Sequence, residues 1–165
     1  MAVCYLETSA LVKRYKTEKG SDVIEELFNG TKGNEGFATS LFTVLEVTAT
    51  ITRLFRGGVL DESPYITIMS RFLRDIRDLV VLPVENELIL ESIEVARGHY
   101  LKAGDAVQIA SALQVSGLLG EGDEVVMIAS DRDVCAAWLA LGLKLINPES
   151  DDAMLNLLEL RDEPR

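Results

Sequence analysis

Short apolar stretches alternate along the chain with longer segments in which apolar residues recur every three or four positions. The stretches are typical of buried strands, and the longer segments are typical of helices with one apolar face. We expect strands at residues 2–6, 36–39, 79–83, 124–129 and 144–147, and helices at 9–16, 21–29, 40–56, 63–78, 85–99, 103–117 and 131–141. Helices between short apolar strands indicate an α/β fold, a three-layer α/β/α sandwich with a central parallel sheet.

Some helix ends and faces carry their own signals. Ser9 is the expected N-cap of the first helix, and Ser63 followed by Pro64 predicts an N-cap and a first helical residue. Residues 31–35 are expected to form a loop. The apolar side of the helix at 85–99 is predicted to consist of Leu88, Ile89, Ile93 and Ala96.

The chain is expected to form one domain over residues 1–148, followed by an acidic tail at 149–165. The chain has 165 residues, and dividing it in two would leave each part near the small end of the usual domain range. The tail contains the segment AMLNLLEL, which could dock as a helix on this chain or on another one.

The charge balance narrows the class of function. With 16 Lys and Arg against 27 Asp and Glu, the net charge is −11, which argues against holding nucleic acid by bulk charge alone. It leaves open an enzyme whose acids hold a metal ion that meets a phosphate, and it suits a basic protein partner. We expect a cytoplasmic protein without a membrane span. Cys4 and Cys135 read as buried free thiols, and a single His makes a zinc site improbable.

Five acids fall where one edge of the predicted sheet would bring them together. Glu7, Asp105 and Asp131 stand at strand ends or helix starts, and Glu46 lies in the second turn of the helix after the second strand. The fifth acid, Asp133, follows Asp131 by two residues. Ligands of open parallel sheets bind beyond the carboxyl ends of the strands. Converging carboxylates without His or Cys suit Mg²⁺ or Mn²⁺ and so indicate phosphodiester hydrolysis. Taken singly, Asp105 and Asp131 also read as ordinary helix caps.

Four segments carry a resemblance to a known family: YLETSALVKRY (5–15), VLEVTATITRL (44–54), LKAGDAVQIASAL (101–113) and MIASDRDVCAAWLALGLKLINP (127–148). In order and spacing they resemble a PIN domain, closest to the VapC-type toxins of toxin–antitoxin pairs. The resemblance covers nearly the whole chain apart from the tail. It implies a metal-dependent ribonuclease whose parallel sheet lies between helices.

By that resemblance, the metal ion, Mg²⁺ or Mn²⁺, would be held by Glu7, Asp105, Asp131 and, as an accessory, Asp133. Glu46 would complete the catalytic set by orienting the water or a second metal. The hydroxyls of Thr8 and Ser130 would steady these acids. The activity implied is cleavage of RNA inside the strand.

Glu7 departs from the family pattern, whose first motif normally has Asp at this position. One extra methylene moves the carboxylate by more than the roughly 0.5 Å that a catalytic site tolerates, unless the backbone compensates. Two alternatives therefore stay open beside the toxin. One is a catalytically attenuated module of the same fold that binds RNA or protein, and the other is a nuclease that processes nucleic acids.

The expected partners are an RNA substrate, a cognate antitoxin protein and further copies of the chain, as a homodimer or a higher assembly. Five basic residues near the acid motifs are candidates for contacting RNA phosphates: Lys13, Arg14, Arg53, Lys102 and Arg132. The alternative for each is ordinary solvated surface.

Overall fold

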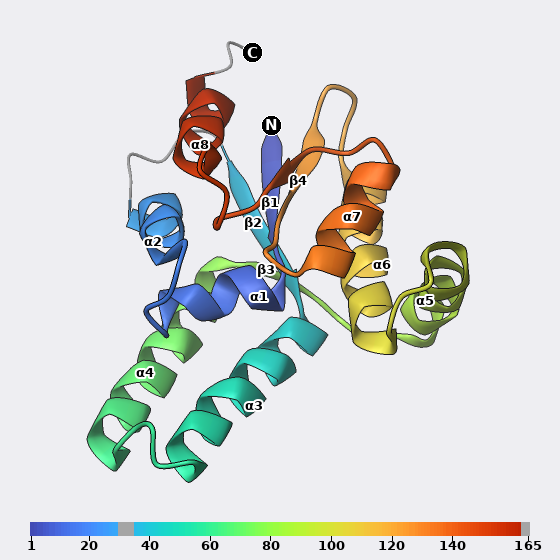
Figure 1. The fold of residues 1–165 in the computed structure, drawn as a ribbon. Helices are drawn as coiled ribbons and strands as arrows, with labels where there is room; N and C mark the ends of the chain where they lie inside the picture. The colour runs from blue at the N-terminus through green and yellow to red at the C-terminus, as the bar shows by residue number, and fades with distance from the viewer. Residues whose placement is uncertain (30–34, 163–165) are drawn as a thin grey trace.

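A five-stranded sheet runs through the centre of the computed structural model, which describes residues 1–29 and 35–162 (Figure 1). Its strands are β1 (Ala2–Leu6), β2 (Gly36–Ser40), β3 (Val80–Leu82), β4 (Glu124–Ile128) and β5 (Leu145–Ile146). They are ordered β3-β2-β1-β4-β5, and every neighbouring pair is parallel. The predicted α/β fold with a central parallel sheet is confirmed.

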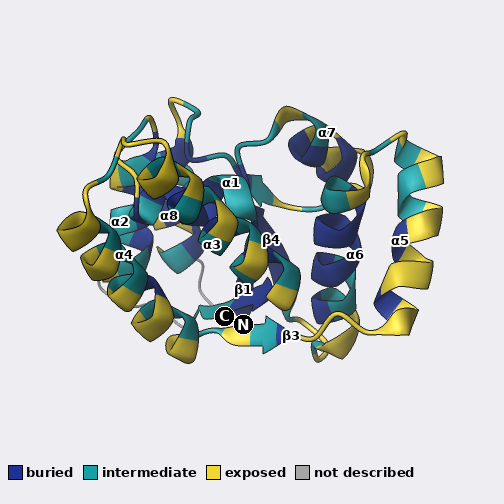
Figure 2. Cartoon of the chain, turned by 90° about the horizontal axis from the view of Figure 1, so that it is seen from below, coloured by how far each residue is buried: buried dark blue, intermediate teal, exposed yellow. Residues whose placement is uncertain are grey.

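Helices cover both faces of this sheet. One face carries α1 (Thr8–Leu11) with the 3₁₀ turn Val12–Arg14, α2 (Ser21–Asn29), α3 (Leu41–Arg56), α4 (Glu62–Asp75) with the 3₁₀ turn Ile76–Asp78, and α8 (Ala153–Asp162). The other carries α6 (Ala103–Leu118) and α7 (Arg132–Ala140), with α5 (Asn86–His99) packed outside α6. Figure 2 shows the middle of α6 buried, whereas the outer side of α5 is exposed.

Alternation along the central strand explains why both faces need a cover. Ala2, Cys4 and Leu6 point into the core beneath α1–α4 and α8, whereas Val3 and Tyr5 point into the core beneath α6 and α7. Each of these side chains is at most 6% exposed. Burying one large apolar side chain stabilises a fold by roughly 1.5–3 kcal/mol, so a strand that is apolar on both sides requires two helical layers.

Two predicted helix starts are wrong. The N-cap of α1 is Glu7 and not Ser9, because the Glu7 side chain accepts from the Ser9 backbone N–H. The fourth helix begins after Asp61, two residues earlier than predicted, which places Pro64 third in the helix, still within the turn whose N–H groups need no helical partner. The expected loop at 31–35 lies outside the described residues except for Glu35.

The predicted apolar face of α5 is also wrong in part. Leu88 is buried, but Ile89 and Ile93 are 43% and 47% exposed, and the buried neighbour of Leu88 one turn on is Ser92. Ser92 satisfies its hydroxyl by donating to the Leu88 carbonyl at 2.7 Å. Because α5 packs chiefly against α6, a narrow strip of its surface is enough to attach it.

The acidic C-terminal segment packs against the rest of the chain. Ala153, Leu157 and Leu160 of α8 are buried in the same core as β1 and α2. The segment before α8 is held closely as well: Gly20 has a φ of +85°, and a Cβ there would lie 2.6 Å from the carbonyl oxygen of Pro148. Of the two dockings left open by the sequence, the helix therefore adopts the one on its own chain. No helix within the described ranges is long and apolar enough to span a bilayer.

Candidate functional site

Three aspartates converge where α6 and α7 begin. Asp131 follows β4 and caps α7, Asp133 lies in the first turn of α7, and Asp105 lies in the first turn of α6. One carboxylate oxygen from each lies within 4.8 Å of the others, and all three side chains are partly exposed. Partial burial, and then the charge of Asp131, raise the pKa of Asp105 above its usual range. The three-aspartate group is therefore a site of negative charge that a cation would relieve.

Asp131 combines the two roles that the sequence left open. Its Oδ1 accepts from the backbone N–H groups of Asp133 at 2.8 Å and Val134 at 3.1 Å, which caps α7. Its Oδ2 receives no hydrogen bond from the part of the chain that the structure describes. Asp105 has no capping role, because the N-cap of α6 is Lys102 and no side chain caps that end. Helix capping thus explains the position of one carboxylate oxygen of Asp131, and it does not explain Asp105.

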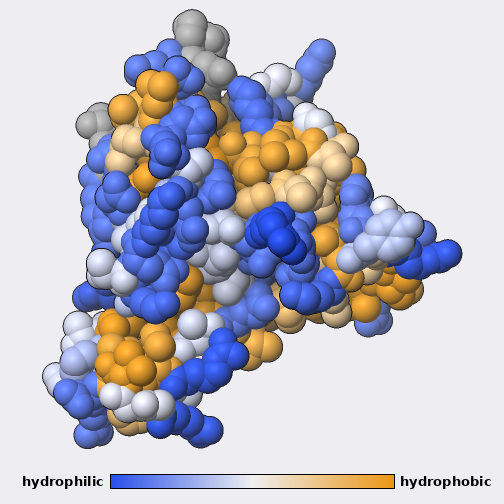
Figure 3. Space-filling view, viewed as in Figure 1, coloured by the Kyte–Doolittle hydropathy of each residue, from blue (hydrophilic) through white to orange (hydrophobic). Residues whose placement is uncertain are grey.

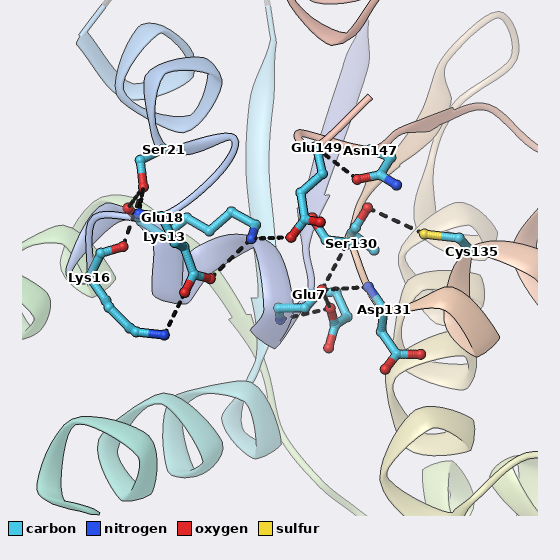
Figure 4. Close-up of polar contacts among 12 residues, drawn as sticks. Glu7, Lys13, Lys16, Glu18, Ser21, Ser130, Asp131, Cys135, Asn147 and Glu149 are labelled. Atoms are coloured by element: carbon cyan, nitrogen blue, oxygen red, sulfur yellow. Dashed lines mark hydrogen bonds and ion pairs between the residues drawn. The ribbon is translucent and has the colours of Figure 1, made fainter. Parts of the chain in front are cut away.

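Glu7 directly follows β1 and points into a cleft that Asp105 and Asp131 also line (Figure 4). Its Oε2 accepts from both the backbone N–H and the hydroxyl of Ser9, and the side chain is buried. Burial raises the pKa of Glu7 to about 7, the two hydrogen bonds from Ser9 oppose that rise, and the charges of Glu46 and Asp131 add to it. Glu7 does not join the oxygens that lie within 4.8 Å of one another.

Glu46 is held by a hydrogen-bond network. Its Oε2 accepts from the Thr8 hydroxyl at 2.5 Å and from Gln108 Nε2 at 2.9 Å. Gln108 is 1% exposed, and its Oε1 accepts from the hydroxyls of Tyr5 at 3.1 Å and Thr43 at 2.9 Å. Each polar atom of this buried amide therefore has a partner, which fixes its orientation and with it that of Glu46.

The sequence prediction missed Gln108, although a signal was present. The residue lies one helical turn after Asp105, on the same side of α6, in a helix whose other buried residues are mostly small or apolar. A lone amide on such a face needs partners, and the acids of the sheet edge are the nearest polar groups.

Ser9 has the role that was predicted for Ser130. Its Oγ donates to Glu7 and accepts from the backbone N–H groups of Ser130 at 2.7 Å and Asp131 at 2.9 Å. The Ser130 hydroxyl is buried without a hydrogen-bond partner among the described residues, so it does not steady the acids. The Thr8 hydroxyl donates to Glu46, and its role in steadying the metal-binding acids stays a prediction. Ser9 thus links the end of β1 to the loop that carries Asp131.

The five basic candidates divide into two groups. Arg53, Lys102 and Arg132 are exposed at the mouth of the site, where Arg53 contacts Thr50 at 2.9 Å and Arg132 contacts Asp133 at 3.2 Å. These three stay candidates for contacting phosphate.

Arg14 is not placed to contact RNA, contrary to the prediction. Its Nε donates to Asp75 at 2.7 Å, its Nη1 to Glu25 at 3.2 Å, and its guanidinium lies 4.0 Å from the centre of the Phe28 ring. The side chain is 8% exposed. Arg14 therefore ties the 3₁₀ turn after α1 to α2 and α4.

Lys13 lines the cleft, but its ammonium is already paired with Glu149 at 2.6 Å and Glu18 at 3.0 Å (Figure 4). Burial lowers the pKa of Lys13, but these hydrogen bonds outweigh that effect and keep it above its usual value. Glu149 belongs to the segment predicted to be a separate tail. The C-terminal segment therefore forms part of the wall of the site.

Glu7, Glu46, Asp105 and Asp131 line one cleft with a volume of about 390 Å³, and Asp133 lies beside Asp105 and Asp131 outside that lining. In each of Glu7, Glu46 and Asp131, hydrogen bonds from the described residues occupy one oxygen and leave the other available. Carboxylate oxygens without His or Cys are the ligands that hard divalent cations prefer. The donor set thus fits a divalent metal ion, and the arrangement can bind one beside a phosphate.

Comparison with known proteins gives a consistent result. A family model described as "PIN domain" matches residues 4–136. "Ribonuclease VapC45" of Mycobacterium tuberculosis (strain CDC 1551 / Oshkosh) is 33% identical over 156 residues, covering 92% of this chain and 99% of the relative.

Solved structures share the fold at lower identity. A "Toxin-antitoxin complex from Klebsiella pneumoniae" has a TM-score of 0.59 at 13% identity and covers 88% of this chain and 97% of that one. FitAcB from Neisseria gonorrhoeae has a TM-score of 0.63 at 16% identity, with the same coverage of 88% and 97%.

Proposed function

The chain belongs to the PIN domain family, and we propose that it is an endoribonuclease that hydrolyses RNA with a divalent metal ion, as the toxin of a toxin–antitoxin pair. The observation that carries this proposal is the three-aspartate group, whose carboxylates meet within 4.8 Å beside Glu7 and Glu46. A ribonuclease 33% identical over almost its whole length supports the same activity.

The metal would be held by Asp105, Asp131 and Asp133, with Glu7 at the inner wall of the cleft. Mg²⁺ or Mn²⁺ fits best, because the site offers carboxylate oxygens alone. When bound, such an ion lowers the pKa of a water and stabilises the leaving oxygen of a phosphodiester. Asp131 can present Oδ2 without losing its cap, since Oδ1 alone accepts from the backbone of α7.

Glu46 would orient the attacking water and receive its proton. Thr8 and Gln108 occupy its Oε2, so Oε1 is the oxygen that can act. A Cβ at Gly104 would lie 3.4 Å from that Oε1, so the glycine before Asp105 leaves this oxygen uncrowded. Arg53, Lys102 and Arg132 would meet the phosphates that flank the cut, which offsets the net charge of −11.

An antitoxin is the expected protein partner, because the structural relatives include a toxin–antitoxin complex. The charge of −11 suits a basic segment on that partner. A homodimer or higher assembly remains our expectation from the family resemblance. Two buried free cysteines favour a reducing compartment, and we expect the cytoplasm.

The test is cleavage of a pool of structured RNAs by the purified protein in Mg²⁺, in Mn²⁺ and in chelator. We expect metal-dependent cuts that disappear in Asp105→Asn, prepared in parallel to exclude a contaminating nuclease. Cleavage that continues undiminished in this variant would overturn the assigned site. Growth arrest on expression, relieved by a small protein encoded next to the gene, would separate a toxin from a processing nuclease.

A second candidate is a catalytically attenuated module of the same fold, and Glu7 favours it. The carboxylate of Glu7 is bound by Ser9 and lies outside the three-aspartate group. Restoring the usual Asp at this position tests it. A large gain in turnover in Glu7→Asp supports attenuation, whereas strong cleavage by the unaltered chain with no gain in the variant excludes it.

A further inference from the structure

A second pocket shares Asp133 with the three-aspartate group. Its volume is about 320 Å³, and it lies between the end of α5 and the outer side of α7. It is lined by His99, Tyr100 and Leu101 after α5, and by Asp133 and three alanines of α7, Ala136, Ala137 and Ala140. The function proposed above uses Asp133 alone of these residues. On the face seen in Figure 3, hydrophobic atoms gather between α8 and α7, near the free ends of α3 and α4, and beside α5 at the right of the view.

Tyr100 is the most exposed large apolar side chain of the described residues, at 95%. Tyr5, Tyr15 and Trp138 are at most 8% exposed, and the next most exposed aromatic side chain among the described residues is Phe55, at 36%. An aromatic ring held in water beside a hollow is unusual, because burying that ring would stabilise the fold. Its ring is therefore available to a ligand.

The backbone at Tyr100 is also unusual. It has φ 56° and ψ 39°, and it is the single residue other than glycine with a positive φ in the described ranges. This left-handed position ends α5, where glycine or asparagine is the ordinary choice. A bulky residue costs free energy there, so its side chain is the reason to look for a function.

The chemistry of the pocket fits a flat, partly polar ring. Three alanines give an apolar lining without long side chains, and Tyr100 offers a face for stacking. His99 has one donor and one acceptor when neutral, which can meet the edge of a base. Lys102 lies three residues before Asp105 and Arg132 directly before Asp133; both are exposed and can meet a strand's phosphates.

We propose that this pocket binds one unpaired nucleobase of the RNA whose phosphate lies at the three-aspartate group. This inference rests on the proposed function and specifies its substrate as RNA that is single-stranded at the cut. The shared residue Asp133 carries the argument, because a ligand in the pocket and a phosphate at the group are then neighbours on one strand. An RNA duplex would keep that base stacked and out of the pocket.

Binding tests the proposal independently of cleavage. A short single-stranded RNA with 2-aminopurine scanned along it is titrated into the Asp105→Asn protein, which leaves the strand uncut. We expect quenching at one position, its loss in Asp105→Asn/Tyr100→Gly, and its retention in Asp105→Asn/Tyr100→Phe. Quenching at no position, or quenching that survives Tyr100→Gly, overturns the pocket.

Kinetics and stability separate a binding role from a structural one. In the unaltered catalytic background, Tyr100→Gly should raise KM about 10-fold with kcat little changed, since stacking on one base is lost. The same variant should raise the midpoint of thermal unfolding by about 2 °C, because glycine accepts the left-handed backbone. Leu118→Gly, at an exposed position at the end of α6, is the control and should leave KM unchanged.

The outcomes distinguish this pocket from the proposed function. If the unaltered protein cleaves no RNA but still quenches 2-aminopurine, the base-binding pocket is supported and the proposed nuclease function is overturned. Cleavage with a KM that Tyr100→Gly does not change would leave the nuclease and overturn the pocket. Weaker antitoxin binding by Tyr100→Gly, together with unchanged RNA binding, would also overturn the assignment of the pocket to a nucleobase, in favour of a protein ligand.

Discussion

Glu7 and Glu46, on the β1–α1–α3 side of the cleft, lie among hydrogen-bond donors, whereas Asp105, on the α6–α7 side, lies among other acids. Ser9 satisfies one oxygen of Glu7, and Thr8 and Gln108 satisfy one oxygen of Glu46. Asp105 receives no hydrogen bond from the described residues, and partial burial, followed by the charges of Asp131 and Asp133, raises its pKa.

The two sides of the cleft therefore differ: hydrogen bonds fix the orientation of the glutamates, whereas negative charge accumulates at the aspartates. The glutamate side is folded into its final geometry by the chain itself, so its carboxylates keep their positions without a ligand. The aspartate side carries repulsion that Lys102 relieves only in part and that a divalent cation would relieve further. Changes on the aspartate side should therefore affect metal binding, and changes on the glutamate side should affect geometry and the stability of the metal-free protein.

The largest expected effect separates the cap of Asp131 from its charge. Asn is as good an N-cap as Asp, so Asp131→Asn should keep the thermal stability in chelator while it lowers the cleavage rate by about 1,000-fold. Asp131→Ala should lose the same activity and, in addition, about 1 kcal/mol of unfolding free energy. Equal stabilities of the two variants would show that the cap contributes nothing.

Glu7 provides the next test, through the stability of the metal-free protein. Its pKa is raised to about 7 in the fold, so the folded state binds the proton more tightly than the unfolded state between pH 4.5 and pH 7. This contribution therefore makes stability fall as pH rises through that window, by on the order of 3 kcal/mol, and then level off.

Glu7→Gln should abolish that decline and be the more stable protein at pH 8 in chelator, since Gln carries no buried charge. Denaturant unfolding at pH 5 and pH 8 measures the effect. If both proteins lose stability equally between these pH values, another group is responsible.

A smaller effect is expected at Gln108. Gln108→Leu keeps the bulk but removes both donors that hold Glu46 and Thr8, so kcat should fall about 10- to 100-fold with KM little changed. Gln114→Leu is the matched control, because Gln114 lies on the same helix and contacts Glu91 at an exposed site. Metal affinity, followed by thermal shift with Mn²⁺, should be unchanged in both variants. A loss of metal affinity in Gln108→Leu would contradict the assignment of metal binding to the aspartate side and of geometry to the glutamate side.

The smallest effect is expected at Arg132, which is 92% exposed and pairs with Asp133 at 3.2 Å. Arg132→Gln should raise KM about twofold at low salt and have no effect at high salt, because exposed charges are screened. Measuring KM at two salt concentrations checks this. A change in KM that is independent of salt would indicate a direct role at the site.

The sequence predicted the strands well because apolar runs flanked by glycine and polar residues leave few alternatives. It predicted the convergence of acids because parallel strands end at one edge. The cap of α1 was predicted at Ser9 because serine is a common cap. In the structure the cap is Glu7, whose side chain accepts from the backbone N–H of Ser9.

Two further features depended on contacts that sequence spacing does not carry. Ile89 and Ile93 have helical spacing but stay exposed, since α5 packs chiefly on α6. The pairing of Lys13 with Glu149 joins residues far apart in the chain and depends on where the C-terminal segment packs. The metal-ligating set itself stays a prediction.

A substitution at Gly20 is expected to have a genetic effect as well as a structural one. Any side chain there would press on Pro148, and the neighbouring Glu149 would be drawn from Lys13 at the wall of the cleft. A missense change at codon 20 would therefore behave as a conditional allele: active at low temperature, where the C-terminal segment still packs, and inactive once heating releases that segment.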